Sequence, residues 1–380
     1  MAGTGLPSEL SPALGEATVD QPSARLALSA ALSAGPAHAY LFSGPRGTGK
    51  RAAARAFAAE ILAANAADPE DARRRALLDP SPHPDLVWVV PPGTQHLVDE
   101  VRDRVIKGAA YRPFEGERRV FVIETAEAMG DESQNALLKT LEEPPSYAHL
   151  ILLSAEPAAL LATVTSRCAP VRFTPLPPEA VEQRLSDAND APEPERAAAA
   201  RLCLGDVERA RFLLSTPGRE LRARAEACAR AARAGTTGER SWLAVLDAAQ
   251  EAGERAGAEA AERVREREEA VGRPEARRRR EAEGAARRVG RAGRTEALDL
   301  SLALCGAWFR DLGAVAEGAS DLALNVDRRD ELREDAEGLD PRAPRRAAEL
   351  VLETRRNLRV NVSEELALEA LLYRAEALLS

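Results

Sequence analysis

A glycine-rich segment that ends in lysine is the feature that most constrains the fold of this chain. The segment Gly44-Pro45-Arg46-Gly47-Thr48-Gly49-Lys50 lies between a short apolar run, 39–42, and an Ala-rich amphipathic stretch, 51–64. Glycines at this spacing let backbone N–H groups converge on phosphate oxygens, while the following helix start and the lysine add positive potential. We predict a strand, a phosphate-binding loop and a helix. The residues expected to contact a nucleotide are Gly44, Gly47, Thr48, Gly49, Lys50 and Arg51.

Further apolar runs indicate that this unit belongs to a parallel sheet. Residues 86–90, 119–123 and 149–153 read as buried strands, and helical patterns separate them. Strands that alternate with helices over about 150 residues predict an α/β domain with a mainly parallel sheet covered on both faces. After the prolines of 175–178 the strand signals end, and the remaining chain is expected to be helical.

The length of 380 residues predicts two or three domains. Segment 250–295 is almost wholly Glu, Arg, Ala and Gly, so it is expected to be a solvated helix or a partly disordered insertion. The run Arg277–Arg280 within it is interpreted as solvated rather than as a DNA patch. The expected division is a flexible tail at 1–20, a nucleotide-site domain at 21–176, a small helical lid at 177–238 and a helical domain at 239–380.

Charge and cysteine usage exclude several classes of protein. A net charge of −9 argues against coating nucleic acid by overall charge, so any DNA contact must be local or shared. The four cysteines form no C-x-x-C pair, which favours a reduced, cytoplasmic setting without a zinc module. No run of about twenty apolar residues occurs, so neither a secretory leader nor a membrane partner is expected.

The nucleotide site departs from an ATPase at two positions. Arg51 stands where a Ser or Thr hydroxyl would bind Mg²⁺. The strand 119–123 ends in Glu124-Thr125, whereas hydrolysing enzymes place two acidic residues there. Glu124 has the chemistry to serve partly as a metal ligand, but a threonine hydroxyl is no general base near neutral pH. We expect ATP or ADP to be bound without hydrolysis.

Several motifs resemble the bacterial clamp-loader family of AAA+ proteins. They are Asn135-Ala136-Leu137-Leu138-Lys139-Thr140-Leu141-Glu142-Glu143-Pro144-Pro145, Ser166-Arg167-Cys168, His38-Ala39-Tyr40-Leu41-Phe42 and His83-Pro84-Asp85-Leu86. The resemblance covers about residues 20–175, nearly half of the chain. Beyond it the likeness is limited to layout and to short patterns such as Trp308-Phe309-Arg310-Asp311.

The resemblance implies roles for particular residues. Arg167 occupies the position of a trans-acting arginine finger, which projects into the nucleotide site of a neighbouring subunit. Hydrolysing members carry a zinc module where this chain has residues 68–75, so no zinc is expected. Glu208 falls near the usual place of a sensor arginine in the second domain. The adjacent pair Glu142-Glu143 is interpreted as a helix end.

The resemblance also implies a function. We expect a three-part, non-motor subunit whose C-terminal helices form an oligomerisation collar within the DNA polymerase III clamp loader, with little ATPase activity of its own. Its partners would be an ATPase motor subunit and a delta-type subunit in a hetero-pentamer, the sliding clamp and, indirectly, primed DNA. Two alternatives remain open: an active motor subunit of the same loader, and an AAA+ adaptor outside replication.

Overall fold

The structure, a computed structural model, describes residues 10–91, 95–186, 191–270, 274–358 and 362–380. The chain divides into two compact units, Met1–Leu176 and Pro177–Ser380, which are described separately below. In the described ranges no helix is both long enough and apolar enough to cross a membrane.

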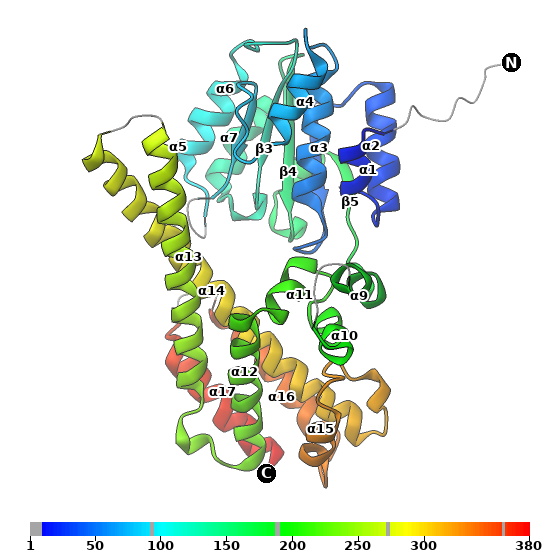
Figure 1. Ribbon diagram of the computed structural model, residues 1–380, viewed down its shortest axis with the longest axis vertical. Helices are drawn as coiled ribbons and strands as arrows, with labels where there is room; N and C mark the ends of the chain where they lie inside the picture. Colours follow the sequence, from blue (N-terminus) through cyan, green and yellow to red (C-terminus); the bar gives the residue numbers. More distant parts are fainter. Residues whose placement is uncertain (1–9, 92–94, 187–190, 271–273, 359–361) are drawn as a thin grey trace, which may run out of the picture. The chain divides into compact units, whose positions relative to one another are not determined.

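A five-stranded sheet forms the centre of the first unit (Figure 1). Its strand order is β2-β3-β4-β1-β5, and every neighbouring pair is parallel. This confirms the predicted parallel sheet, and all four strands predicted from apolar runs are present. The strands are β1 (Ala39–Ser43), β2 (Leu86–Val89), β3 (Arg119–Ile123), β4 (Ala148–Ser154) and β5 (Ala169–Arg172).

The fifth strand escaped sequence analysis. It has four residues, of which only Val171 is buried, and it contains Pro170. A proline cannot donate to a strand ladder, so it is tolerated only at an edge. β5 is such an edge, because it pairs with β1 alone.

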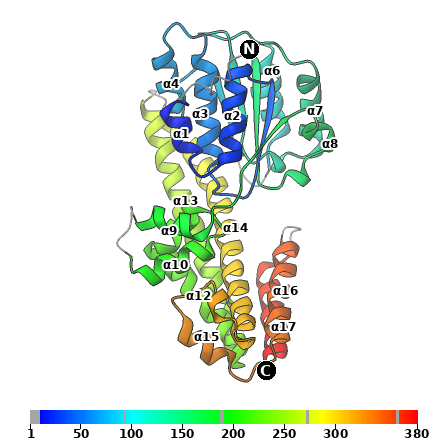
Figure 2. The same ribbon diagram turned by 90° about the vertical axis from the view of Figure 1, so that its right-hand side faces the viewer.

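Helices cover both faces of this sheet (Figure 2). Along β1, Tyr40 and Phe42 enter a core with α3, while Leu41 enters a second core with α7 on the opposite face. This alternation follows from the two-residue period of a strand. The helices of the unit are α1 (Pro12–Ala17), α2 (Pro22–Ala34), α3 (Lys50–Ala63), α4 (Pro69–Leu77), α5 (Val98–Glu100), the π-helical η1 (Val101–Ile106), α6 (Lys107–Ala109), η2 (Ala126–Ala128), α7 (Asp131–Glu142), η3 (Pro157–Ala159) and α8 (Ala162–Thr165).

The expectation of a loose tail over residues 1–20 is wrong for its second half. α1 begins after Ser11, whose side chain accepts a hydrogen bond from Leu14 N, and Leu14 is fully buried in the core beside α3. Thr18 Oγ1 donates to Leu14 O at 2.6 Å and closes the helix. The Gly- and Pro-rich composition of this segment gave no indication of α1, which is anchored to the core by one buried leucine, Leu14. Residues 1–9 lie outside the described ranges.

Every regular element in the described part of the second unit is a helix, as predicted. Residues 250–270 belong to α13 and residues 275–295 to α14, Pro274 caps α14, and 271–273 lie outside the described ranges. The end of the chain forms two helices, α16 and α17. The elements are α9 (Pro178–Ser186), α10 (Glu193–Leu202), α11 (Val207–Leu214), α12 (Thr216–Ala234), η4 (Thr237–Glu239), α13 (Trp242–Ala270), α14 (Glu275–Ala316), η5 (Ser320–Leu322), α15 (Arg329–Ala336), α16 (Arg342–Asn357) and α17 (Glu364–Leu379).

α13 and α14 pack through small residues and form what we call the α13–α14 hairpin (Figure 1). A Cβ atom added to Gly253 would lie 2.6 Å from Gly290 O, and one added to Gly257 would lie 2.8 Å from Ala286 O. Contacts this short leave no room for any side chain. The two backbones therefore touch, and glycine is required at both positions.

A buried polar cluster fixes the segment after α14. Asp311 is fully buried, and its carboxylate accepts hydrogen bonds from Leu324 N, Asn325 N and Asn325 Nδ2 at 2.8–3.0 Å. Arg222 of α12 in turn contacts Asn325 Oδ1 at 2.9 Å and both carboxylate oxygens of Asp327. The Trp-Phe-Arg-Asp pattern thus has a structural meaning, because its aspartate satisfies the backbone of a neighbouring turn.

Three histidines of the first unit predict a dependence of stability on pH. Burial lowers the pKa of His83, His96 and His149 below its ordinary value of 6.5. The unfolded chain therefore binds protons more readily than the folded chain does. The contribution of these histidines to the free energy of unfolding is fully present above about pH 6.5, and it is lost as the pH falls toward their folded-state pKa values. The urea concentration at the midpoint of unfolding is expected to decrease when the pH is lowered from about 7.5 to about 5.5.

The matched variant is His149→Gln, since glutamine can also reach Ala37 O, which His149 Nδ1 contacts at 2.9 Å. This variant should show a shallower pH dependence, because one titrating group has been removed. A midpoint that does not change with pH in the wild type would contradict the prediction.

Candidate nucleotide site

The predicted strand, glycine loop and helix are present as β1, residues 44–49 and α3. Gly44 has φ 150°, and a Cβ there would lie 2.1 Å from Phe173 O, so no side chain fits. Gly49 caps α3 in the left-handed region at φ 87°, which only glycine adopts readily. The loop therefore has the backbone shape that its glycines predict.

A residue that sequence analysis missed anchors this loop. Gln21, 4% exposed, donates from Nε2 to Thr48 O at 3.2 Å and to Thr174 O at 2.8 Å, and its Oε1 accepts from Thr174 N. One amide side chain thus joins the start of α2, the glycine loop and the segment after β5. The only signal in the sequence is a polar residue next to Pro22, which is too common to be informative.

The lysine of the loop is turned onto the loop itself. Lys50 is buried, and its Nζ lies 2.5 Å from Gly44 O and 2.5 Å from Pro45 O, with Thr48 Oγ1 at 3.5 Å. The ammonium group therefore lies inside the curve of the loop, where its three donors have carbonyl and hydroxyl acceptors.

The side chains of Arg51 and Glu124 are neighbours, as is expected if both belong to one nucleotide site. Arg51 Nε lies 3.5 Å from Glu124 Oε2, and Arg51 Nη2 pairs with Asp79 Oδ2 at 2.8 Å. Trp88 Nε1 donates to Glu124 Oε2 at 2.8 Å. The same oxygen of Glu124 therefore faces both a guanidinium and an indole N–H.

A second arginine extends this cluster. Arg55 pairs with Asp79 Oδ1 at 3.0 Å, and its Cζ lies 4.4 Å from the centre of the Trp88 ring. Burial lowers the pKa of Arg55 although Asp79 opposes the shift. Sequence analysis missed Asp79, Trp88 and Arg55, since they contact one another from a loop, a strand and a helix that no local pattern connects.

Thr125 adopts a left-handed conformation, with φ 53° and ψ 54°, which is unusual for a β-branched residue. The backbone around it is fixed from both sides. His96 Nε2 lies 2.7 Å from Glu124 O, and Ala128 N donates to Thr125 O at 2.9 Å. The residue thus serves the turn after β3, and its hydroxyl offers no base for activating water.

Arg167 lies between α8 and β5, apart from the glycine loop in the chain. Its Nη2 pairs with Glu142 Oε1 at 2.6 Å and its Nη1 donates to Thr163 O at 2.9 Å, while its side chain is 35% exposed. Glu142 is the last residue of α7, as the helix-end interpretation expected. Burial raises the pKa of the neighbouring Cys168 thiol to about 12, so this cysteine is an unreactive packing group.

The remaining motif residues have structural contacts. In His83-Pro84-Asp85-Leu86, His83 Nδ1 accepts from Asp85 N, and the buried Asp85 carboxylate accepts from Phe114 N and Glu115 N. Residues 68–75 form a helix start, with Asp68 as its cap. In the described part of the chain, no group of three or more His, Cys, Asp or Glu side chains is placed to hold a metal ion.

Glu208, near the expected place of a sensor arginine, lies in the first turn of α11. Its carboxylate pairs with Arg211 Nη1 at 2.5 Å. The cap of α11 is the preceding Asp206, which accepts from Arg209 N at 3.0 Å. The acidic side chain is therefore engaged within its own helix.

The fold and the site together define a class of protein. A phosphate-binding loop follows β1, an acidic residue ends β3, and β4 lies between these two strands in a parallel five-stranded sheet. This is the arrangement of an AAA+ P-loop domain. Residues 21–177 match the family model described as DNA polymerase III, delta subunit. Over this segment the chain is similar to the clamp-loader family of AAA+ proteins.

Curated relatives agree with this assignment. The DNA polymerase III subunit delta' of Pseudomonas aeruginosa is 42% identical over 147 residues, covering 37% of this chain and 44% of the relative. The subunit delta' of Bacillus subtilis is 34% identical over 161 residues, covering 42% and 49%. The subunit tau of Bacillus subtilis is 34% identical over 156 residues, covering 40% and 28%. The chain thus spans less than half the length of each of these relatives.

Proposed function

We propose that this chain is a non-motor, delta-prime-type subunit of the DNA polymerase III clamp loader, which helps to load the sliding clamp onto primed DNA. The observation that carries the proposal is the match of residues 21–177 to this family, combined with a site in which Arg51 faces Glu124. The relatives named delta' are similar over the same domain.

The altered site supports a non-motor role. Hydrolysis needs a metal held near the terminal phosphates and a group that orients water. Here the guanidinium of Arg51 pairs with the carboxylate that would help to hold a metal, and Thr125 replaces the second acidic residue. A guanidinium is covalently part of the chain and cannot perform the ligand exchange of a magnesium ion.

Nucleotide binding without turnover is part of the proposal. The glycine loop, Lys50 and Arg51 offer N–H groups and two positive charges to the phosphates of ATP or ADP. Lys50 Nζ would have to exchange the carbonyls of Gly44 and Pro45 for phosphate oxygens, and Gly47 and Thr48 would line the same curve. Arg51 would neutralise phosphate charge in place of a divalent cation.

The proposed action on hydrolysis is through Arg167 in the site of a neighbouring motor subunit. Its guanidinium is partly exposed and held by Glu142 and Thr163 O, both of which lie on the chain itself. An arginine positioned in this way can exchange a surface carboxylate for a phosphate of a partner. The proposed partners are a motor subunit, a delta-type subunit and the clamp.

Reconstitution tests this function. The purified full chain, mixed with the motor and delta-type subunits of the same organism, should form a discrete hetero-oligomer that loads the clamp onto primed DNA, and loading should require this chain. The chain alone should hydrolyse ATP no faster than its Lys50→Ala variant.

Two results would overturn the proposal. ATP hydrolysis by the chain alone that Lys50→Ala abolishes would identify a motor subunit. Failure to associate with any loader subunit or with the clamp would indicate an AAA+ adaptor outside replication.

A further inference from the structure

One face of α14 carries a row of arginines without acidic partners. Arg280, Arg287, Arg288 and Arg291 are all exposed, and none has an ion pair within the described part of the chain. At 3.6 residues per turn, positions 280, 287 and 291 return to nearly the same side of a helix, with 288 next to them. We call these four residues the arginine face.

Other arginines of the hairpin differ in that they are paired. Arg278 lies 3.4 Å from Glu269, Arg279 lies 2.8 Å from Glu283, and Arg265 lies 3.2 Å from Glu262. Three of the four arginines of the run Arg277–Arg280 are therefore compensated, since Arg277 also lies 3.9 Å from Glu281. The uncompensated arginines are Arg280, at the end of that run, and Arg287, Arg288 and Arg291 further along the helix.

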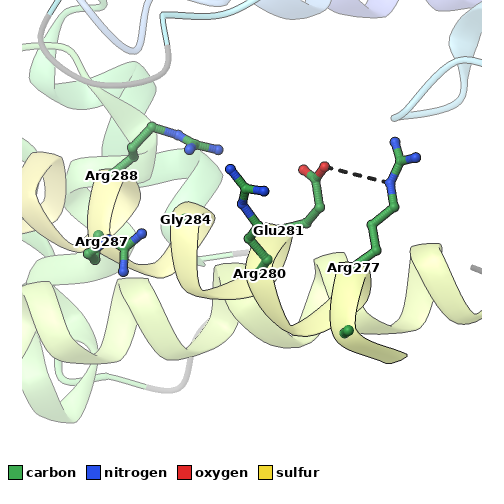
Figure 3. A pocket seen from close by; sticks show the side chains of 7 residues that line it. Arg277, Arg280, Glu281, Gly284, Arg287 and Arg288 are labelled. Carbon is green, nitrogen blue, oxygen red and sulfur yellow. Dashed lines mark ion pairs between the residues drawn. The ribbon is translucent and has the colours of Figure 1, made fainter. Parts of the chain in front are cut away.

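A glycine shapes the middle of this face. Figure 3 shows Arg280 and Arg288 extending from either side of Gly284, with the pair Arg277 and Glu281 beyond Arg280. A Cβ on Gly284 would lie 3.1 Å from Arg288 Nη1, so the missing side chain lets that guanidinium lie across the helix. These residues line a hollow that is open to solvent and bordered by several guanidinium groups.

The two helices of the hairpin carry opposite charge. Residues 275–294 of α14 contain eight Arg and three Glu, whereas residues 251–270 of α13 contain seven Glu and four Arg. At Gly253 and Gly257 the backbones of α13 and α14 lie in direct contact. This part of α14 therefore carries a net positive charge, although the net charge of the whole chain is −9.

The composition of this face distinguishes between two kinds of acidic partner. Protein interfaces have an apolar or aromatic centre, which this face lacks, because positions 277, 280, 281, 284, 287, 288 and 291 are Arg, Glu or Gly. Phosphate backbones, in contrast, are bound by charge and by bidentate guanidinium contacts. From 280 to 291 the helix rises about 16 Å, which corresponds to about five phosphates of one DNA strand along the axis.

We propose that the arginine face of α14 is a binding surface for the phosphate backbone of duplex DNA, independent of base sequence. Arg280 and Arg288 would hold a phosphate over Gly284, and Arg287 and Arg291 would contact further phosphates. The surface belongs to the helical unit and does not depend on the nucleotide site or on the clamp-loader assignment.

Fluorescence anisotropy with the full chain and a short labelled duplex tests this surface. The variant Arg280→Gln/Arg287→Gln/Arg291→Gln should bind at least about tenfold more weakly at low salt. Its slope of log affinity against log salt should be smaller by about two to three, because each phosphate contact contributes about 0.9. All three side chains are exposed, so circular dichroism should show an unchanged helix content.

The matched control is Arg265→Gln/Arg278→Gln/Arg279→Gln, which removes the same charge from the same hairpin at ion-paired positions. It should keep the affinity and the slope within about twofold of the wild type. Equal losses in the two variants would show that net charge alone matters and would overturn the proposal. So would absence of duplex binding by the wild type, or equally tight binding to polyglutamate, which would indicate an acidic protein surface instead.

Discussion

Arg167→Ala is expected to reduce ATP hydrolysis at the neighbouring motor site of the assembled loader by about 10³-fold. A guanidinium supplied in trans stabilises the charge that develops on the transferred phosphoryl group, and alanine removes it completely. The measurement is single-turnover hydrolysis in a reconstituted loader in which the subunit facing this chain is the one motor subunit that keeps its phosphate-binding lysine. Assembly, followed by gel filtration, should not change.

Two further variants separate charge from geometry. Arg167→Lys keeps the positive charge but loses the planar fork, so it should restore only a small part of the rate. Glu142→Gln removes the ion pair that holds Arg167 in the free chain, with Nη2 and Oε1 2.6 Å apart, and leaves the finger intact. Its hydrolysis rate should therefore stay close to the wild type. Unchanged turnover with Arg167→Ala would show that this arginine does not act in trans.

Asp311→Ala is expected to lower the free energy of unfolding of the helical unit by about 3–5 kcal/mol. The carboxylate is fully buried and accepts hydrogen bonds from Leu324 N, Asn325 N and Asn325 Nδ2, all of which the substitution leaves without this acceptor. The adjacent Arg222 would also lose order, because Asn325 positions one of its contacts. Urea unfolding followed by circular dichroism measures the change.

A surface aspartate in the same unit provides the control. Asp330 pairs with Arg333 at 3.3 Å, but its side chain is 94% exposed, so Asp330→Ala should change the free energy of unfolding by less than about 0.5 kcal/mol. Similar values for the two variants would mean that the buried cluster contributes no more than a solvated ion pair.

The glycine loop was predictable from sequence because its constraints are local. The glycines, Lys50 and the flanking strand and helix are neighbours in the chain, so the residue pattern specifies the backbone directly. Arg51 and Glu124 were also expected at one site, since a parallel sheet brings the carboxyl ends of its strands to one edge. The ion pair between them, however, depends on side-chain directions that appear only in the structure.

Contacts between distant segments account for what sequence analysis missed. Gln21 bonds to residues 48 and 174, and Trp88 contacts both Arg55 and Glu124. These residues are far apart in the sequence, and no periodic pattern predicts such contacts. β5 was missed because an edge strand with one buried residue has little apolar signal. The arginine face was missed because its members are spread unevenly, one to seven positions apart, among many other charged residues.

The seam between α13 and α14 has a thermodynamic consequence. Glycine and alanine expose little apolar surface when they separate, and exposed apolar surface is the main source of the heat-capacity increase on unfolding. Separation of the hairpin, with Gly253 against Gly290 and Gly257 against Ala286, should therefore carry a small heat-capacity change for its length. Its free energy should vary almost linearly with temperature, so this hairpin would lose little stability on cooling, whereas the aromatic core around Phe42 and Phe57 would follow a strongly curved profile.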